Sequence, residues 1–193
     1  MDKGLLRLSK FLSLILRHKP EEIGLEIGAG GWMTFSSLRD ACQVRGIGLT
    51  LSDLMEVVGS NDKQRFAVSE DGLHIRASQG HSIKVDLGYE PMSPPGLLYH
   101  GTAERFLSPI RQEGLLKRNR QHVHLSAAVE TVLKIGQRHG KPVVLTVQAA
   151  RMFAYGLTFY LSDNRVGLTE HVPPEYLLFP SRKGEEADAD ERT

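Results

Sequence analysis

The chain has little of what several classes of protein require. Cys42 is the only cysteine among 193 residues, so an intrachain disulfide and a multi-cysteine metal site are both excluded. No apolar run approaches the roughly 20 residues that a membrane-spanning helix needs, and no signal peptide opens the chain. These absences predict a cytoplasmic protein without a membrane segment, and we expect it to be a monomer.

An excess of charge of either sign is also missing. The 24 Lys and Arg residues nearly balance the 23 Asp and Glu residues, which gives a formal net charge of +1. Residues 1–90 carry 11 basic against 12 acidic side chains, and residues 91–180 carry 10 against 6. A broad basic stripe for nonspecific duplex binding is therefore not visible. Any nucleic-acid site must be local and built from a few placed arginines.

Several catalytic motifs are absent as well. The sequence contains no Walker phosphate loop, no Rossmann Gly-x-Gly-x-x-Gly and no His-Glu-x-x-His. It offers no nucleophile elbow and no obvious pair of carboxylates for glycosidase chemistry. His122 and His124 have a spacing that some metal sites use, but no second cysteine or acidic cluster accompanies them. We expect no metal.

The first stretch with a clear pattern covers residues 5–20. Four apolar residues at helical spacing predict an amphipathic helix, namely Leu8, Phe11, Leu12 and Ile15. Pro20 should end this helix near His18, which leaves Arg17 and His18 side by side in the last turn. The pair could complement the helix dipole. It could also form an anion site from a permanent charge and a titratable neighbour.

The remainder of the first half has the pattern of a small helical unit with a hairpin. Residues 24–31 suggest a short strand and turn, residues 35–42 and 52–58 short helices, and residues 65–68 and 73–76 a β-hairpin. Three helices followed by a hairpin suggest a winged-helix lobe over residues 1–90. The alternation predicts that Phe66, Val68, Leu73 and Ile75 face the core, and that Arg65, His74 and Arg76 share the opposite face.

The second half is strand-rich. Three prolines and a glycine in residues 91–96 predict a linker and a domain boundary. Residues 97–180 suggest short strands with two or three helices, one ending at Gly114 and another capped by Ser126. The charged tail, residues 181–193, is nearly free of apolar residues and is predicted to be disordered. The expected class is α/β in the broad sense, more specifically α+β.

Residues able to bind a phosphate recur through both halves. Arg17, Arg65, Arg120 and His18 could together enclose a phosphate dianion with charge-assisted hydrogen bonds. Two further segments, residues 99–102 and 122–126, combine small residues with hydrogen-bonding side chains, as suits a close approach of backbone to a ligand.

Five motifs resemble one family. They are SKFLSLILRHKP (9–20), DKQRF (62–66), QGHS (79–82), YHGT (99–102) and RQHVHLS (120–126), and residues 136–142 fit as well. In order and spacing they are similar to the NAD-dependent RNA (tRNA) 2′-phosphotransferases, which remove the splice-junction 2′-phosphate from tRNA. The resemblance runs from about residue 5 to residue 180 and leaves only the tail unexplained.

The resemblance implies a fold and a reaction. An N-terminal winged-helix lobe would engage RNA, and a C-terminal ADP-ribosyltransferase-like lobe would hold NAD. The RNA 2′-phosphate would first attack the nicotinamide ribose, which gives a 2′-phospho-ADP-ribosyl RNA and nicotinamide. The ribose O2″ would then attack the phosphate and release 2′-OH RNA and ADP-ribose 1″,2″-cyclic phosphate. Whether His18 acts as base or acid stays open.

The resemblance also assigns roles to residues. The catalytic set would be Arg17, His18, Arg65 and Arg120. NAD would be held by His100, Gly101, Thr102, His124, Ser126 and Arg138, and RNA by Lys10, Arg76, Gln79 and His81. The late glutamate of protein-modifying ADP-ribosyltransferases aligns with Val172, although Glu170 or Glu175 could be argued. Two alternatives stay open: an ADP-ribosyltransferase acting on nucleic-acid terminal phosphates or on protein, and a noncatalytic reader of RNA or ADP-ribose.

Overall fold

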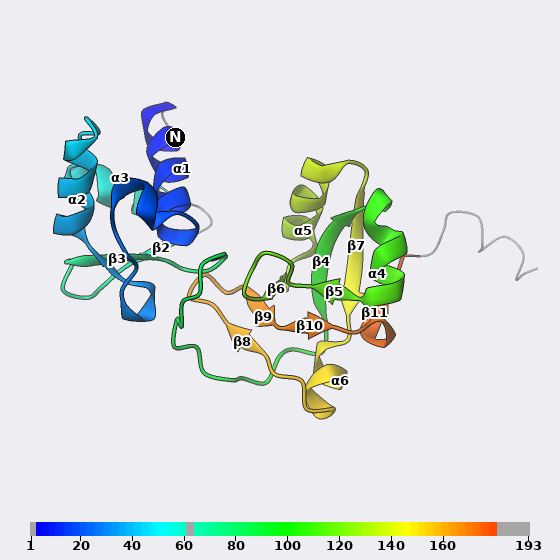
Figure 1. The fold of residues 1–193 in the computed structure, drawn as a ribbon. Coiled ribbons are helices and arrows are strands. Elements are labelled where there is room, and N and C mark those ends of the chain that lie inside the picture. Colours follow the sequence, from blue (N-terminus) through cyan, green and yellow to red (C-terminus); the bar gives the residue numbers. More distant parts are fainter. Residues whose placement is uncertain (1–2, 61–63, 181–193) are drawn as a thin grey trace, which may run out of the picture.

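A computed structural model describes residues 3–60 and 64–180, without the side chain of His139, and combines helices with small antiparallel sheets (Figure 1). This confirms the α+β class. The tail 181–193, predicted to be disordered, lies outside the described residues, as do two residues of the DKQRF motif. No helix in the described ranges is both long and apolar enough to cross a membrane.

The N-terminal half contains helices α1 (Lys3–Arg17), α2 (Phe35–Val44) and α3 (Leu51–Gly59), 3-10 turns η1 (Pro20–Ile23) and η2 (Ala29–Gly31), and strands β1 (Met33–Thr34), β2 (Phe66–Val68) and β3 (His74–Ala77). Helix α1 ends within one residue of the position that Pro20 predicts. The prediction of a strand in residues 24–31 is wrong. Gly30 and Gly31 adopt positive φ angles of 67° and 78°, so the chain turns there and the strand begins after Trp32.

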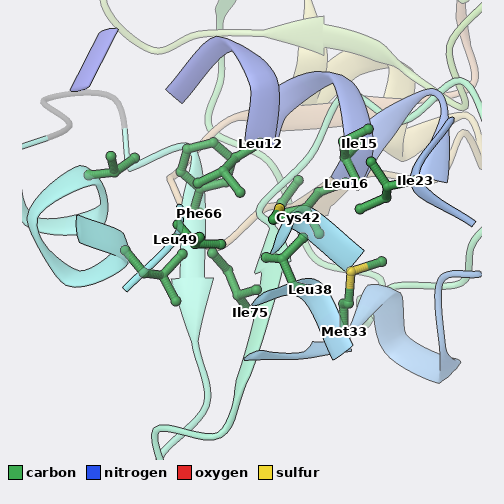
Figure 2. Close-up of a cluster of buried hydrophobic side chains, with 13 residues drawn as sticks. Leu12, Ile15, Leu16, Ile23, Met33, Leu38, Cys42, Leu49, Phe66 and Ile75 are labelled. Atoms are coloured by element: carbon green, nitrogen blue, oxygen red, sulfur yellow. The ribbon is translucent and has the colours of Figure 1, made fainter. Parts of the chain in front are cut away.

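Strands β1, β3 and β2 form an antiparallel sheet, with the hairpin β2–β3 extended by β1 at one edge. Its inner face packs with the three helices around a core that includes Leu12, Ile15, Phe66 and Ile75 (Figure 2). Leu73 was predicted to face this core, but it is 61% exposed. Strand β3 begins one residue later, so the alternation that buries Ile75 does not extend back to Leu73.

The C-terminal half contains strands β4 (Leu98–Ala103), β5 (Leu115–Leu116), β6 (Val123–Leu125), β7 (Pro142–Val147), β8 (Tyr160–Leu161), β9 (Gly167–Thr169), β10 (His171–Val172) and β11 (Leu177–Leu178), helices α4 (Leu107–Glu113), α5 (Val129–Gly136) and α6 (Ala149–Ala154), and turns η3 (Glu104–Phe106), η4 (Gln137–His139) and η5 (Pro174–Tyr176). The strands pair as β11-β7-β4, β6-β9-β8 and β10-β5. Ser126 does not cap α5, because the helix begins three residues later, at Val129. Its hydroxyl instead accepts a hydrogen bond from the Ala128 amide at 3.1 Å.

A backbone bridge at Tyr99 and Ser126 connects two sheets of this half. Tyr99 and Ser126 exchange two backbone hydrogen bonds of 2.8 and 2.9 Å, which link the sheet containing β4 to the sheet containing β6. Helix α5 packs against β4 and β7 (Figure 1). The bridge therefore brings the histidine after Tyr99 close to the histidine of β6.

Each half has its own hydrophobic cluster, and polar contacts join the two halves. The Arg76 guanidinium pairs with the Asp163 carboxylate at 2.7 Å, and the Gln121 amide donates to the Ile83 carbonyl at 3.0 Å. The backbone of the segment between the halves is also tied down, because Met92 N donates to the Phe159 carbonyl at 2.8 Å.

Candidate active site

Three arginines from separate parts of the chain lie close together. Arg17 ends α1, Arg65 directly precedes β2, and Arg120 lies in the loop before β6. The Arg17 Nη2 atom donates to the Arg65 carbonyl at 3.1 Å. Burial, and the positive charges of Arg65 and Arg120, lower the pKa of Arg17 to about 10, so it stays charged at neutral pH. None of the three pairs with a carboxylate among the described residues, so the positive charges of the cluster are not neutralised by these residues.

His18 lies beside this cluster. Its Nδ1 atom is 2.8 Å from the Ser82 hydroxyl oxygen. Burial lowers the pKa of His18, and the charges of Arg17 and Arg120 lower it further, because both effects disfavour a second positive charge. The environment of the free protein therefore favours the neutral imidazole. A bound phosphate dianion would act in the opposite direction and favour the imidazolium.

Two histidines, His100 and His124, lie next to the bridge between Tyr99 and Ser126, and their contacts define their tautomers. Arg120 Nη1 lies 2.7 Å from His124 Nδ1, and a guanidinium can only donate, so Nδ1 accepts and Nε2 carries the proton. His100 Nδ1 lies 3.1 Å from the His124 carbonyl oxygen, so here Nδ1 donates and Nε2 is left as an acceptor. Burial and Arg120 lower the pKa of His124 to about 3, and burial lowers the pKa of His100. The pair therefore offers one donor and one acceptor without added charge.

A cavity of about 430 Å³ opens beside these histidines. Six residues predicted from sequence line it: Gln79, His100, Gly101, Arg120, His124 and Ser126. None of the described residues in its lining carries a carboxylate. Between residues 3 and 180, leaving out 61–63, no group of three or more His, Cys, Asp or Glu side chains is arranged to hold a metal ion.

Some lining residues were not predicted. They come from the end of β5, from the loop before β6 and from α5: Leu116, Lys117, Arg118, Asn119, Thr131, Val132 and Ile135. The run of basic residues just before the histidine strand could have indicated the loop. The α5 residues have no such signal. Thr102 is instead buried within β4, at 6% exposure, and Arg138 lies exposed on η4.

The residues predicted to bind RNA divide into two groups. Lys10 is exposed on α1, and Gln79 lines the cavity. Arg76 lies over the Trp32 ring, with 4.6 Å between Cζ and the ring centroid, and its side chain is only 14% exposed beside Asp163. His81 is 1% exposed. In this conformation Arg76 and His81 support the structure around the site and do not present a surface to a ligand.

Burial of His81 leads to a prediction about acid stability. Burial and the neighbouring charges of Arg17, His18 and Arg76 lower the pKa of His81 to about 4. Between that value and the ordinary pKa of about 6.5, the unfolded chain binds a proton that the folded chain does not. The stabilising contribution is therefore complete above pH 6.5 and is lost as the pH falls toward 4. Between pH 7 and pH 5, the loss from this one group should be on the order of 2 kcal/mol.

Urea unfolding of the wild type and of His81→Gln at pH 7 and pH 5 tests this prediction. The variant keeps a polar side chain but cannot ionise, so its free energy of unfolding should fall less on acidification. The remaining buried histidines are common to both proteins and cancel in the difference. An equal loss of stability in the two proteins would contradict the assignment.

Comparison with known proteins adds to this geometry. The family model described as RNA 2′-phosphotransferase, Tpt1 / KptA family, matches residues 3–171. The probable RNA 2′-phosphotransferase of Acaryochloris marina is 53% identical over 178 residues, which cover 92% of this chain and 98% of that protein. The protein of the same name from Agrobacterium fabrum is 53% identical over 93% of this chain and 97% of its own length. The resemblance found in the motifs is confirmed, and the chain belongs to the RNA 2′-phosphotransferase, Tpt1 / KptA family.

Proposed function

We propose that this protein removes an internal 2′-phosphate from RNA by transferring it to NAD. The observation that carries the proposal is the cluster of three guanidiniums without a described carboxylate partner, linked through Arg120 and His124 to a cavity of about 430 Å³. A phosphate dianion would complete the cluster, and the family name of the relatives states the transfer of an RNA 2′-phosphate.

The same proposal divides the chain into parts. Residues 1–90 would form a winged-helix lobe that engages RNA, residues 91–96 a linker, and residues 97–180 an ADP-ribosyltransferase-like lobe that holds NAD. Two separate hydrophobic clusters and the polar contacts between them support this division. Lys10 and Gln79, both accessible, would contact RNA, while Arg76 and His81 would keep the neighbouring surface in shape.

The volume of the cavity and the charge of its lining both suit a dinucleotide. Ligand pockets usually enclose roughly 300–1,000 Å³, and basic side chains without carboxylates suit a pyrophosphate. His124 Nε2–H, His100 Nε2 and the backbone at Gly101 would hold the ribose side of NAD, with Ser126 in the same lining. Thr102, buried in β4, and Arg138, exposed on η4, would contribute only from outside this lining. Bound NAD would supply an acceptor carbon, the nicotinamide leaving group and the ribose hydroxyl that takes the phosphate from RNA.

The protein's own residues would act mainly on charge. Arg17, Arg65 and Arg120 hold the phosphoryl oxygens and stabilise the negative charge that develops on them during transfer. Each such preorganised donor contributes about 3 kcal/mol in the transition state. The ionised phosphate needs no base in the first step, which agrees with Val172 at the position of the usual glutamate. In the second step His18 would accept the proton of the attacking hydroxyl or donate one to the departing RNA oxygen.

Incubation with NAD and a short 2′-phosphorylated oligonucleotide tests the proposal, with products identified by mass. We expect 2′-OH RNA, nicotinamide and ADP-ribose 1″,2″-cyclic phosphate, and none of these from the unphosphorylated oligonucleotide. Stable ADP-ribosylated RNA without the cyclic phosphate would favour an ADP-ribosyltransferase. Absence of nicotinamide release with any phosphorylated RNA would favour a noncatalytic reader.

A further inference from the structure

The segment after the QGHS glycine is hydrogen-bonded to the C-terminal end of α1. The Ser82 and Ile83 amides both donate to the Arg17 carbonyl, at 3.0 and 3.4 Å. The Ser82 hydroxyl reaches the next residue, with 2.8 Å between Oγ and His18 Nδ1. One residue therefore holds the backbone at Arg17 and the ring of His18 at the same time.

We infer that Ser82 is a positioning residue that fixes the ring of His18, so that Nε2 faces the phosphate site. This inference rests on the proposed function. Because Nδ1 is engaged by the Ser82 hydroxyl, Nε2 is the nitrogen left for substrate. Ring orientation set by the partner of the second nitrogen is a general device of catalytic and metal-binding histidines.

A hydroxyl suits a histidine that must change its protonation state. It can donate to the bare Nδ1 of a neutral ring and accept from the N–H of an imidazolium. A carboxylate in its place would hold the ring charged. The other charged or titratable groups that act on this part of the site are Arg17, Arg120 and His81. The two guanidiniums can only donate, and neither ring nitrogen of His81 is hydrogen-bonded to His18.

The same segment is tied to the other half of the molecule. The Gln121 side-chain amide donates to the Ile83 carbonyl at 3.0 Å, and Gln121 directly follows Arg120. Residues 82 and 83 thus contact both the end of α1 that carries Arg17 and His18 and the loop that carries Arg120. The position of Ser82 therefore fixes His18 relative to the arginine from the opposite half.

The test compares Ser82→Ala with Ser82→Thr, which keeps the hydroxyl, and with Ser36→Ala at an exposed site on α2. Single-turnover consumption of purified 2′-phospho-ADP-ribosyl RNA is measured across pH 5.5 to 8.5. Loss of one such hydrogen bond should slow this step roughly tenfold and move the midpoint of its pH profile. Ser82→Thr should stay within about threefold of the wild type, and Ser36→Ala should not differ.

Nitrogen chemical shifts of His18 give a second readout that needs no turnover. The Nδ1 resonance and the titration midpoint of His18 should change in Ser82→Ala and return toward wild-type values in Ser82→Thr. If the wild-type protein releases no nicotinamide, the proposed function is refuted. The His18 chemical shifts then decide the inference about Ser82 on their own. Wild-type shifts and a wild-type pH profile in Ser82→Ala would overturn the role of Ser82.

Discussion

Replacement of Arg120 by alanine is expected to let 2′-phospho-ADP-ribosyl RNA accumulate, because the second chemical step should slow roughly 100-fold or more. Charge builds on the nonbridging phosphoryl oxygens when phosphorus is attacked, and a fixed guanidinium stabilises that charge. In the proposed reaction the first step breaks a bond at a ribose carbon instead, so it should depend less on the same donor. Arg17→Ala should show the same pattern because Arg17 belongs to the same cluster, and so should His18→Ala because His18 lies beside the cluster and is proposed to move a proton in this step.

Single-turnover reactions that separate substrate, intermediate and product measure this effect. Arg105→Ala is a matched control, since Arg105 lies exposed on η3, over the Phe106 ring. Arg120 also donates to His124 Nδ1, so His124→Ala should be measured beside it. If the intermediate accumulates with Arg120→Ala but not with His124→Ala, the guanidinium acts on the phosphate directly. If Arg17→Ala, His18→Ala and Arg120→Ala slow both steps equally, the proposed division of roles is contradicted.

Features with a local cause could be predicted from the sequence. The apolar stripe of α1 and the proline after it define both the buried face of that helix and the end that carries Arg17 and His18. The hairpin was predicted for the same reason, since strand alternation and a turn sequence are local signals. The caps of α2 and α3 at Thr34 and Thr50 are equally local interactions, because a hydroxyl or carboxylate needs only to reach an amide three residues away.

Features set by distant partners could not be predicted. The two-residue strands β1, β5 and β10 exist because each pairs with a strand far along the chain, and so short a segment has no pattern of its own. Arg76 lies on a strand face that the local alternation predicts to be solvent-exposed. In the structure its guanidinium is instead covered by Asp163, which comes 87 residues later in the chain. His81 belongs to a polar stretch, but it packs beside the end of α1 and becomes almost inaccessible. Placement of the site between the halves depends on such contacts.

Replacement of Gly101 by alanine is expected to destabilise the fold by about 3 kcal/mol or more. Gly101 lies in the middle of β4, paired with Val144 of β7, and helix α5 crosses directly over it. A Cβ atom at this position would lie 2.0 Å from the Val132 carbonyl oxygen and 2.7 Å from its carbon. Both are backbone atoms of α5, so no change of rotamer relieves the overlap, and the helix must move away from the sheet.

That movement couples stability to ligand binding, because Val132 and Ile135 of α5 line the cavity together with Gly101. In Gly101→Ala, both the free energy of unfolding measured in urea and the affinity for NAD measured by calorimetry should therefore be lower. Gly48→Ala is the matched control, since a Cβ there has no atom within 4 Å, and its stability should stay within about 0.5 kcal/mol of the wild type. If Gly101→Ala is as stable as Gly48→Ala, α5 does not approach β4 this closely. The position of α5 in the cavity wall would then be wrong.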